Sequence, residues 1–184
     1  MFDLKNLLLQ LKRENIRVCL LKGAAYIGHY FPDYGMRTMG DIDILVSPAD
    51  IEKLNNCLES NGYNVSSNYT GADARGLQQV FKATPFVNAR GTEIDAHQYL
   101  STYVGDPTFN EILWATSHPI DLFEIDNAVY VLNPACQLIH TVIHGLQYAP
   151  ESSIRWITDA AYLLRDHMDA IDWQQLLSIC QEYH

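Results

Sequence analysis

Hydrophobic residues near the N-terminus recur at helical spacing and then give way to a strand-like run. Leucines three and four positions apart predict an amphipathic helix with the apolar stripe Leu4, Leu7, Leu8 and Leu11. The uninterrupted apolar run at 18–21 predicts a buried strand. Gly23 ends that strand, and residues 24–30 favour a helix that stops at a turn signal at 32–35. The chain is therefore expected to open as helix, strand, helix.

An alternation of acidic and apolar residues introduces the next strand. Residues 41–46 alternate at first and end in an apolar run, which predicts a strand. The segment 47–50, Ser-Pro-Ala-Asp, is typical of a helix start, with an N-cap serine and proline at the first helical position. Asn61-Gly62 ends that helix, because these residues tolerate the left-handed conformation. Residues 63–76 predict irregular structure, and 71–76 predict a loop near the functional site.

Two further turn signals predict two hairpins. A short glycine-bearing connection separates the strand-like segments 79–86 and 92–100. The dipeptide Asp126-Asn127 separates 120–125 from 129–132 and predicts a second, shorter hairpin.

After Asn133-Pro134 the hydrophobic spacing becomes helical. Three helices are predicted from their apolar stripes, which are Leu138, Ile139, Val142 and Ile143, then Ile154, Ile157, Ala161 and Leu164, then Trp173, Leu176, Leu177 and Cys180. We therefore expect an α/β fold, with a small mixed sheet flanked by helices at 1–133 and a helical region at 134–184. The last helix reaches the chain end at His184, which leaves a continuation beyond it open.

Composition narrows the class of partner. With 48% hydrophobic residues, a chain of 184 residues can bury a sizeable core. The net charge of -10 disfavours a nucleic-acid acceptor, because few basic residues are available to neutralise phosphates. The scattered cysteines (Cys19, Cys57, Cys136 and Cys180) predict reduced thiols. The sequence shows neither a signal peptide nor an apolar stretch that could span a bilayer, so a soluble, cytoplasmic protein is expected.

Acidic residues occur where strands would bring them together. Side chains alternate along a strand, so Asp41 and Asp43 share one face while the isoleucines beside them point into the core. The same period places Glu93, Asp95 and His97 on one face of a later strand, and a neighbouring strand could add Asp95 to the first pair. Crowded carboxylates favour Mg²⁺ or Mn²⁺ over zinc. The pattern predicts a divalent-metal site.

A possible phosphate-binding turn precedes these acids. Three carboxylates that bind two metal ions suit phosphoryl transfer, because one ion activates the attacking hydroxyl and the other holds the triphosphate. Such chemistry also needs backbone amides close to the phosphates, and Lys22-Gly23-Ala24 at a strand-to-helix junction could supply them. Gly23 has no side chain to block the approach.

Three segments carry a family pattern. They are Leu20-Leu21-Lys22-Gly23-Ala24-Ala25, Arg37-Thr38-Met39-Gly40-Asp41-Ile42-Asp43-Ile44-Leu45-Val46 and Glu93-Ile94-Asp95-Ala96-His97. The sequence resembles the nucleotidyltransferase superfamily of DNA polymerase beta, and more closely a branch of uncharacterised bacterial nucleotidyltransferases with the pattern LKG…R..GDIDLLV. The resemblance implies transfer of a nucleoside monophosphate (NMP) from a bound nucleoside triphosphate (NTP), such as ATP, to a hydroxyl acceptor, with release of pyrophosphate.

The resemblance also implies residue roles. Asp41, Asp43 and Asp95 correspond to ligands of Mg²⁺ or Mn²⁺, and Asp95 also to the base for the acceptor hydroxyl. The residues expected to bind the nucleotide are Lys22, Gly23, Ala24 and Arg37.

The match departs from the superfamily at two points. Ala24 stands where serine is usual, which removes a hydroxyl donor to phosphate. The gap from Gly23 to Asp41 is long, as in the uncharacterised branch, whose insert carries the arginine that Arg37 matches. The resemblance extends into the back half at Asn133-Pro134, His140, His144 and Arg155-Trp156-Ile157-Thr158-Asp159.

Several side chains have two interpretations. Lys22 could contact the triphosphate or extend to solvent, and Arg37 could contact the triphosphate or pair with a nearby aspartate. His97 could orient a carboxylate or the acceptor, or make a structural hydrogen bond. His140 and His144 share a helix face, which suits a metal pair or, more commonly, core histidines.

Two other classes of function stay open. The chain could be an inactive nucleotidyltransferase-fold module, for example the antitoxin of a pair; Ala24 favours this and the intact acids oppose it. It could also be a metal hydrolase built on His140, His144, Asp95 and His97. The residues do not identify the acceptor, which could be a small molecule such as an antibiotic, a protein hydroxyl or an RNA end. They do not indicate the oligomeric state either.

Overall fold

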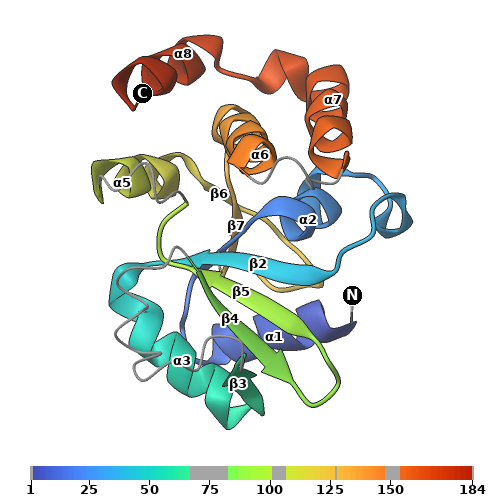
Figure 1. Cartoon of the computed structure of the whole chain (residues 1–184), viewed down its shortest axis with the longest axis vertical. Coiled ribbons are helices and arrows are strands. Elements are labelled where there is room, and N and C mark those ends of the chain that lie inside the picture. The colour runs from blue at the N-terminus through green and yellow to red at the C-terminus, as the bar shows by residue number, and fades with distance from the viewer. Residues whose placement is uncertain (1, 67–82, 101–106, 127, 148–153, 184) are drawn as a thin grey trace. The chain divides into compact units, whose positions relative to one another are not determined.

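A computed structural model describes residues 2–66, 83–100, 107–126, 128–147 and 154–183, and these contain one mixed β-sheet (Figure 1). Its strands are β1 (Val18–Leu20), β2 (Asp41–Val46), β3 (Tyr63–Val65), β4 (Ala83–Asn88), β5 (Glu93–His97), β6 (His118–Pro119) and β7 (Val129–Val131). They lie in the order β3-β4-β5-β2-β1-β7-β6. β2 pairs in parallel with β5, and β1 with β7, whereas the pairs β1–β2, β3–β4 and β4–β5 are antiparallel. The expected α/β class with a mixed sheet is confirmed.

The helices belong to two compact units. They are α1 (Phe2–Arg13), α2 (Lys22–Ala25), α3 (Ile51–Ser60), α5 (Pro107–Thr116), α6 (Pro134–Gln147), α7 (Arg155–His167) and α8 (Trp173–Glu182). One unit, which we call the sheet unit, comprises Met1–Gly105 and Pro119–Val131, and the other, the helical unit, comprises Asp106–His118 and Leu132–His184. The two units therefore interleave along the chain, since α5 belongs with α6, α7 and α8.

Alternating residues of the central strand decide which face of the sheet is apolar. Ile42, Ile44 and Val46 of β2 belong to one buried cluster together with leucines of α1 and α3. Because successive side chains of a strand point to opposite faces, Asp43 projects from the face opposite this cluster. The same alternation applies to β5, where Ile94 and Ala96 join the cluster and Asp95 between them does not.

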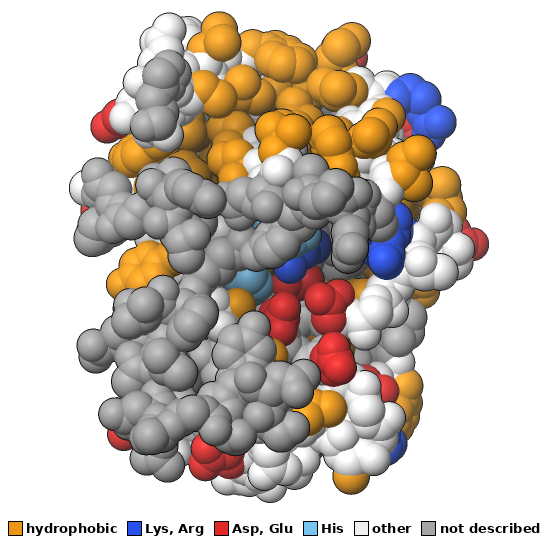
Figure 2. Space-filling model, in the orientation of Figure 1, with side chains coloured by type: hydrophobic (Ala, Val, Ile, Leu, Met, Phe, Trp, Pro, Cys, Tyr) orange, Lys and Arg blue, Asp and Glu red, His pale blue; other side chains and the backbone are white. Residues whose placement is uncertain are grey.

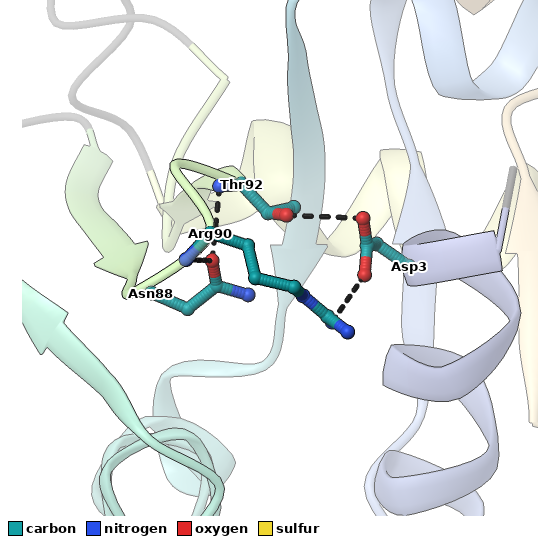
Figure 3. A network of polar contacts seen from close by, with 4 residues as sticks. All are labelled: Asp3, Asn88, Arg90 and Thr92. Atoms are coloured by element: carbon teal, nitrogen blue, oxygen red, sulfur yellow. Dashed lines mark hydrogen bonds and ion pairs between the residues drawn. The ribbon is translucent and has the colours of Figure 1, made fainter.

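Polar contacts fasten the start of α1 to the turn between β4 and β5 (Figure 3). The Asp3 carboxylate accepts a hydrogen bond from Thr92 Oγ1 at 3.0 Å and forms an ion pair with Arg90. Asn88 Oδ1 accepts hydrogen bonds from the backbone amides of Arg90 and Thr92 at 2.9 and 3.0 Å. An acid in the first helical turn also interacts favourably with the helix dipole. This network holds the β4–β5 turn, and thereby the starting point of β5.

Most elements predicted from hydrophobic spacing are present. The start of the 47–60 helix is confirmed, because Ser47 Oγ accepts a hydrogen bond from the Ala49 amide at 3.3 Å within a 3₁₀ turn, Pro48–Asp50, that leads into α3. The stop is confirmed as well, since Gly62 has φ +81°. The hairpin of β4 and β5 and the helices α6, α7 and α8 also match the prediction. The predicted loop at 71–76 lies outside the described residues.

Three details differ from the prediction. The irregular structure expected from residue 63 is wrong for β3, which becomes a strand because β4 offers it a pairing edge. The strand expected at 120–125 is also wrong: β6 ends before it, and Phe123 and Glu124 have φ 59° and 64°, which a strand does not accommodate. Helix α5 was not predicted.

The helical unit depends on a close approach of two helices. α6 and α7 are neighbours, and a Cβ atom added at Gly145 of α6 would lie 2.2 Å from Trp156 Cδ2 of α7 and 2.3 Å from its Cγ.

Among the described residues no helix is both long enough and apolar enough to cross a membrane. The four cysteines are free thiols, three of them buried.

We expect Gly145→Ala to destabilise the helical unit by about 1–3 kcal/mol, because the new methyl group would force the Trp156 ring or the helix axis to move. Urea unfolding followed by tryptophan fluorescence measures this. Gly40→Ala is the matched control, since a Cβ atom there meets nothing within 4 Å, and its effect should stay within about 0.5 kcal/mol. Equal effects of the two substitutions would contradict the packing argument.

Candidate active site

The parallel pairing of β2 with β5 places two acids side by side. Asp43 is the register partner of Asp95, and Asp41 is the partner of Glu93. Register partners on neighbouring strands point to the same face, which here is the face opposite the apolar cluster. The sequence prediction that Asp95 joins the acids of the 41–46 strand is thus met in the geometry. Figure 2 shows acidic side chains gathered near the middle of one face, with basic and histidine side chains next to them.

Asp43 is the buried member of this group. Asp43 is 1% exposed. His97, two residues beyond Asp95 on β5, is also 1% exposed. His97 Nε2 lies 3.0 Å from Asp43 Oδ1, and the Lys22 ammonium pairs with the same oxygen. A buried carboxylate persists only where charges or donors compensate the lost hydration, and here two side chains do so. This contact with Asp43 fits either a histidine that orients a carboxylate or one that makes a structural hydrogen bond, which are two of the roles considered for His97.

The electrostatic balance differs between the two neighbouring acids. Burial works against ionised Asp43, but the hydrogen bond from His97 and the charge of Lys22 outweigh it and lower the pKa of Asp43 to about 2. Asp95 has the opposite shift: burial and the nearby charge of Asp43 raise its pKa. Burial also opposes the charged form of Lys22, yet the charge of Asp43 raises the pKa of the lysine overall. The site therefore holds Asp43 as a carboxylate and Lys22 as an ammonium.

The donor set fits a hard divalent cation. One ligand atom each from Asp43, Asp95 and His97 lies within 4.8 Å of the other two, and no other such group occurs in the described part of the chain. The two carboxylates are the oxygen donors that Mg²⁺ and Mn²⁺ prefer. His97 already contacts Asp43, so it serves as the partner that fixes a ligand's orientation. Asp41 lies outside this group, although its charge acts on Lys22.

The turn predicted at Lys22-Gly23-Ala24 lies at the junction between β1 and α2, as expected. The bend between β1 and α2 falls on Lys22, whose φ of 43° lies in the left-handed region, rather than on Gly23. The side chain of Ala24 is fully buried in the apolar cluster. A serine hydroxyl at that position would begin from a buried Cβ.

Gly23 is needed for a close contact with Arg37. A Cβ atom at Gly23 would lie 2.7 Å from Arg37 Nη1 and 3.4 Å from its Cζ. The same Nη1 donates a hydrogen bond to the Thr38 carbonyl at 2.7 Å. The guanidinium is therefore held against the backbone at the start of α2, where the first amides of the helix lie. The structure brings these two predicted nucleotide-binding residues together.

The two histidines of α6 lie close to each other within the helical unit. His140 is 4% exposed, and its ring centroid lies 6.2 Å from that of His144. Neither belongs to a group of three potential metal ligands among the residues that the structure describes. Arg155 begins α7 as an exposed residue, whereas Asp159 of the same helix is buried.

Comparison with known proteins agrees with this geometry. The model of a family described as "Uncharacterised nucleotidyltransferase" matches residues 1–184, so the chain belongs to that family. No curated protein sequence matches significantly. The fold is shared with the antibiotic-resistance factor ANT(2'')-Ia in solution, with a TM-score of 0.66, 10% identity, and coverage of 98% of this chain and 90% of that one.

Two further structures share the fold. A crystal structure of ANT(2'')-Ia in complex with adenylyl-2''-tobramycin has a TM-score of 0.62 and 11% identity, covering 89% of this chain and 87% of that one. The lincosamide antibiotic adenylyltransferase LnuA, lincomycin-bound, has a TM-score of 0.59 and 13% identity, covering 89% and 95%. The chain is thus a nucleotidyltransferase with the sequence resemblance confirmed at the level of the superfamily.

We expect Asp43→Asn to destabilise the metal-free protein by about 3 kcal/mol, because it leaves the Lys22 ammonium without its partner in a mostly buried position. Thermal and urea unfolding in EDTA measure the change. Asp41→Asn is the matched control and should cost less than about 1 kcal/mol, since Asp41 is more exposed. A larger loss of stability in Asp41→Asn than in Asp43→Asn would show that Asp43 does not anchor the cluster.

Proposed function

We propose that this nucleotidyltransferase moves an NMP from an NTP·Mg²⁺ complex to a hydroxyl acceptor and releases pyrophosphate. The observation that carries the proposal is the parallel register that sets Asp43 beside Asp95, next to the Arg37-covered start of α2. In the reaction the acceptor oxygen forms a bond to the α-phosphorus, the bond from that phosphorus to the bridging oxygen breaks, and pyrophosphate leaves. The hydroxyl proton passes to a base.

Each residue has a proposed task. Asp41, Asp43 and Asp95 hold Mg²⁺ or Mn²⁺, and Asp95 accepts the hydroxyl proton at a carboxylate oxygen. The bound cations would supply charge neutralisation for the triphosphate and the leaving pyrophosphate. Arg37 and the amides of Gly23 and Ala24 bind phosphate oxygens, since guanidinium groups and helix-start amides both favour anions. We also propose that 1–133 is the catalytic part and 134–184 a helical part that assists it.

The acceptor is proposed to be a small molecule with a free hydroxyl, or alternatively a protein hydroxyl. ANT(2'')-Ia was solved with adenylyl-2''-tobramycin, and the adenylyltransferase LnuA with lincomycin, so both structures contain a small-molecule partner. Because an adenylyl group is named in both cases, ATP is the first donor to test. The net charge of -10 makes a nucleic-acid acceptor unfavourable.

We expect Asp95→Asn to reduce NMP transfer by a factor of about 100 to 10,000, since it removes both a cation ligand and the proton acceptor. The measurement combines pyrophosphate release with transfer of α-labelled NTP to a panel of aminoglycosides, other small alcohols and protein extracts. Asp121→Asn, an exposed acid of the sheet unit, is the control and should retain full activity. Activity that survives both Asp95→Asn and Asp43→Ala would exclude this site as the catalytic centre.

Nucleotide binding without turnover by the unaltered protein would point instead to the binding module considered from the sequence. Calorimetry with ATP and Mg²⁺ measures binding independently of any acceptor. The distinction matters because an inactive module would bind the nucleotide tightly and give no pyrophosphate with any acceptor in the panel.

Gly23→Ala should weaken NTP binding by roughly 10- to 100-fold, because the new methyl group displaces the Arg37 guanidinium and a charge-assisted contact of this kind contributes about 1.5–3 kcal/mol. Calorimetry with a non-hydrolysable NTP gives the dissociation constant. Gly40→Ala, which meets no neighbour, should leave it unchanged. An unaltered NTP affinity in Gly23→Ala would show that Arg37 does not contribute to phosphate binding.

A further inference from the structure

Lys22 has a backbone conformation that a non-glycine residue rarely adopts. Its φ of 43° lies in the left-handed region, at the point where β1 turns directly into α2. Such strain persists only where surrounding interactions over-determine it, and it concentrates at functional sites. The side chain of Lys22 is 17% exposed, so this unusual backbone directs an ammonium into the protein rather than into solvent.

The ammonium lies where the negative charges converge. It pairs with Asp43, whose side chain is 2% exposed, and the charges of Asp41 and Asp95 also act on it. The charge of Lys22 offsets only part of the charge of these three carboxylates. The cluster on this face of the sheet therefore keeps a net negative charge. The oxygen that Lys22 contacts, Asp43 Oδ1, is also the oxygen that faces His97 Nε2. That oxygen has little room for an additional cation while Lys22 stays in place.

We propose that Lys22 is the resident counter-ion of the acidic cluster: it holds Asp43 and Asp95 together in the metal-free protein and leaves Asp43 when a divalent cation binds. The inference rests on the proposed function, because it concerns the same metal site. It makes Lys22 a positioning residue whose ammonium competes with the cation. Once displaced, the ammonium is free to contact an incoming triphosphate, which couples loading of the cation to binding of the nucleotide.

If Lys22 competes with the cation, its substitution should change the cation affinity in the direction opposite to that of most substitutions. Removal of a side chain that merely stabilises the fold leaves cation affinity unchanged or weakens it. Removal of a competing positive charge strengthens it, because repulsion between two cations a few ångströms apart disappears. The stability of the metal-free protein should move the other way, since Asp43 then loses the ammonium that compensates its burial.

The test is Mn²⁺ binding without nucleotide, followed by electron paramagnetic resonance and calorimetry, in Lys22→Met and the unaltered protein. We expect the dissociation constant of Mn²⁺ to fall by about tenfold or more in Lys22→Met. In EDTA the same variant should melt at a lower temperature, and saturating Mg²⁺ should raise its melting temperature more than that of the unaltered protein. An unchanged or weaker Mn²⁺ affinity would overturn the proposal.

Lys12→Met is the matched control. It removes the same charge from the sheet unit, where Lys12 forms a surface ion pair with Asp126. This control should leave Mn²⁺ affinity and the Mg²⁺-dependent rise in melting temperature unchanged. A tightening as large as in Lys22→Met would mean that the effect comes from net charge and not from Lys22.

A second measurement does not depend on the folding of Lys22→Met. In the unaltered protein with ¹³C-labelled lysine, the signal assigned to Lys22 by its loss in Lys22→Arg should shift on titration with Mg²⁺ but not with the same ionic strength of KCl. A signal that does not move would overturn the displacement. Since neither measurement uses NTP, a protein that shows both effects but transfers no NMP would sustain the inference and refute the proposed function.

Discussion

The burial of one ionised carboxylate organises this site. Asp43 sits on the central strand with an exposed fraction of 1%, and its charge is tolerated because Lys22 and His97 reach the same oxygen. Each partner comes from a different segment, the bend after β1 and the end of β5. The arrangement therefore exists only when β1, β2 and β5 are correctly paired, which makes the acidic cluster a product of the whole sheet.

The two sides of the sheet have separate tasks. Alternation along β2 sends Ile42 and Ile44 into the apolar cluster and Asp43 to the opposite face, so the residues that stabilise the fold and those proposed for catalysis occupy one strand. The network around Asp3 acts on the other end of β5, where it holds the β4–β5 turn. A shift of β5 by one residue would turn Asp95 toward the apolar cluster and Ile94 toward the opposite face.

The turn at the start of α2 lies where the sequence predicts it, but the surroundings of its residues differ from the prediction. The left-handed φ at the expected turn belongs to Lys22, and Gly23 leaves room for the Arg37 guanidinium. Ala24 was expected to matter through a missing hydroxyl, yet its side chain belongs to the core. Two cations thus lie at the start of α2, Lys22 paired with Asp43 and Arg37 against Gly23.

The sequence by itself determined the elements whose signals are local: the leucine stripe of α1, the cap at Ser47, the turn at Gly62 and the alternation that puts Asp41 and Asp43 on one face. Those signals depend on spacing and backbone preference, which a short segment contains. Tertiary structure alone decided that Asp43, rather than Asp41, is buried against His97, and that Lys22 turns inward. Strand β3 likewise required the edge of β4. These outcomes depend on which distant segment becomes a neighbour, and no local pattern encodes that choice.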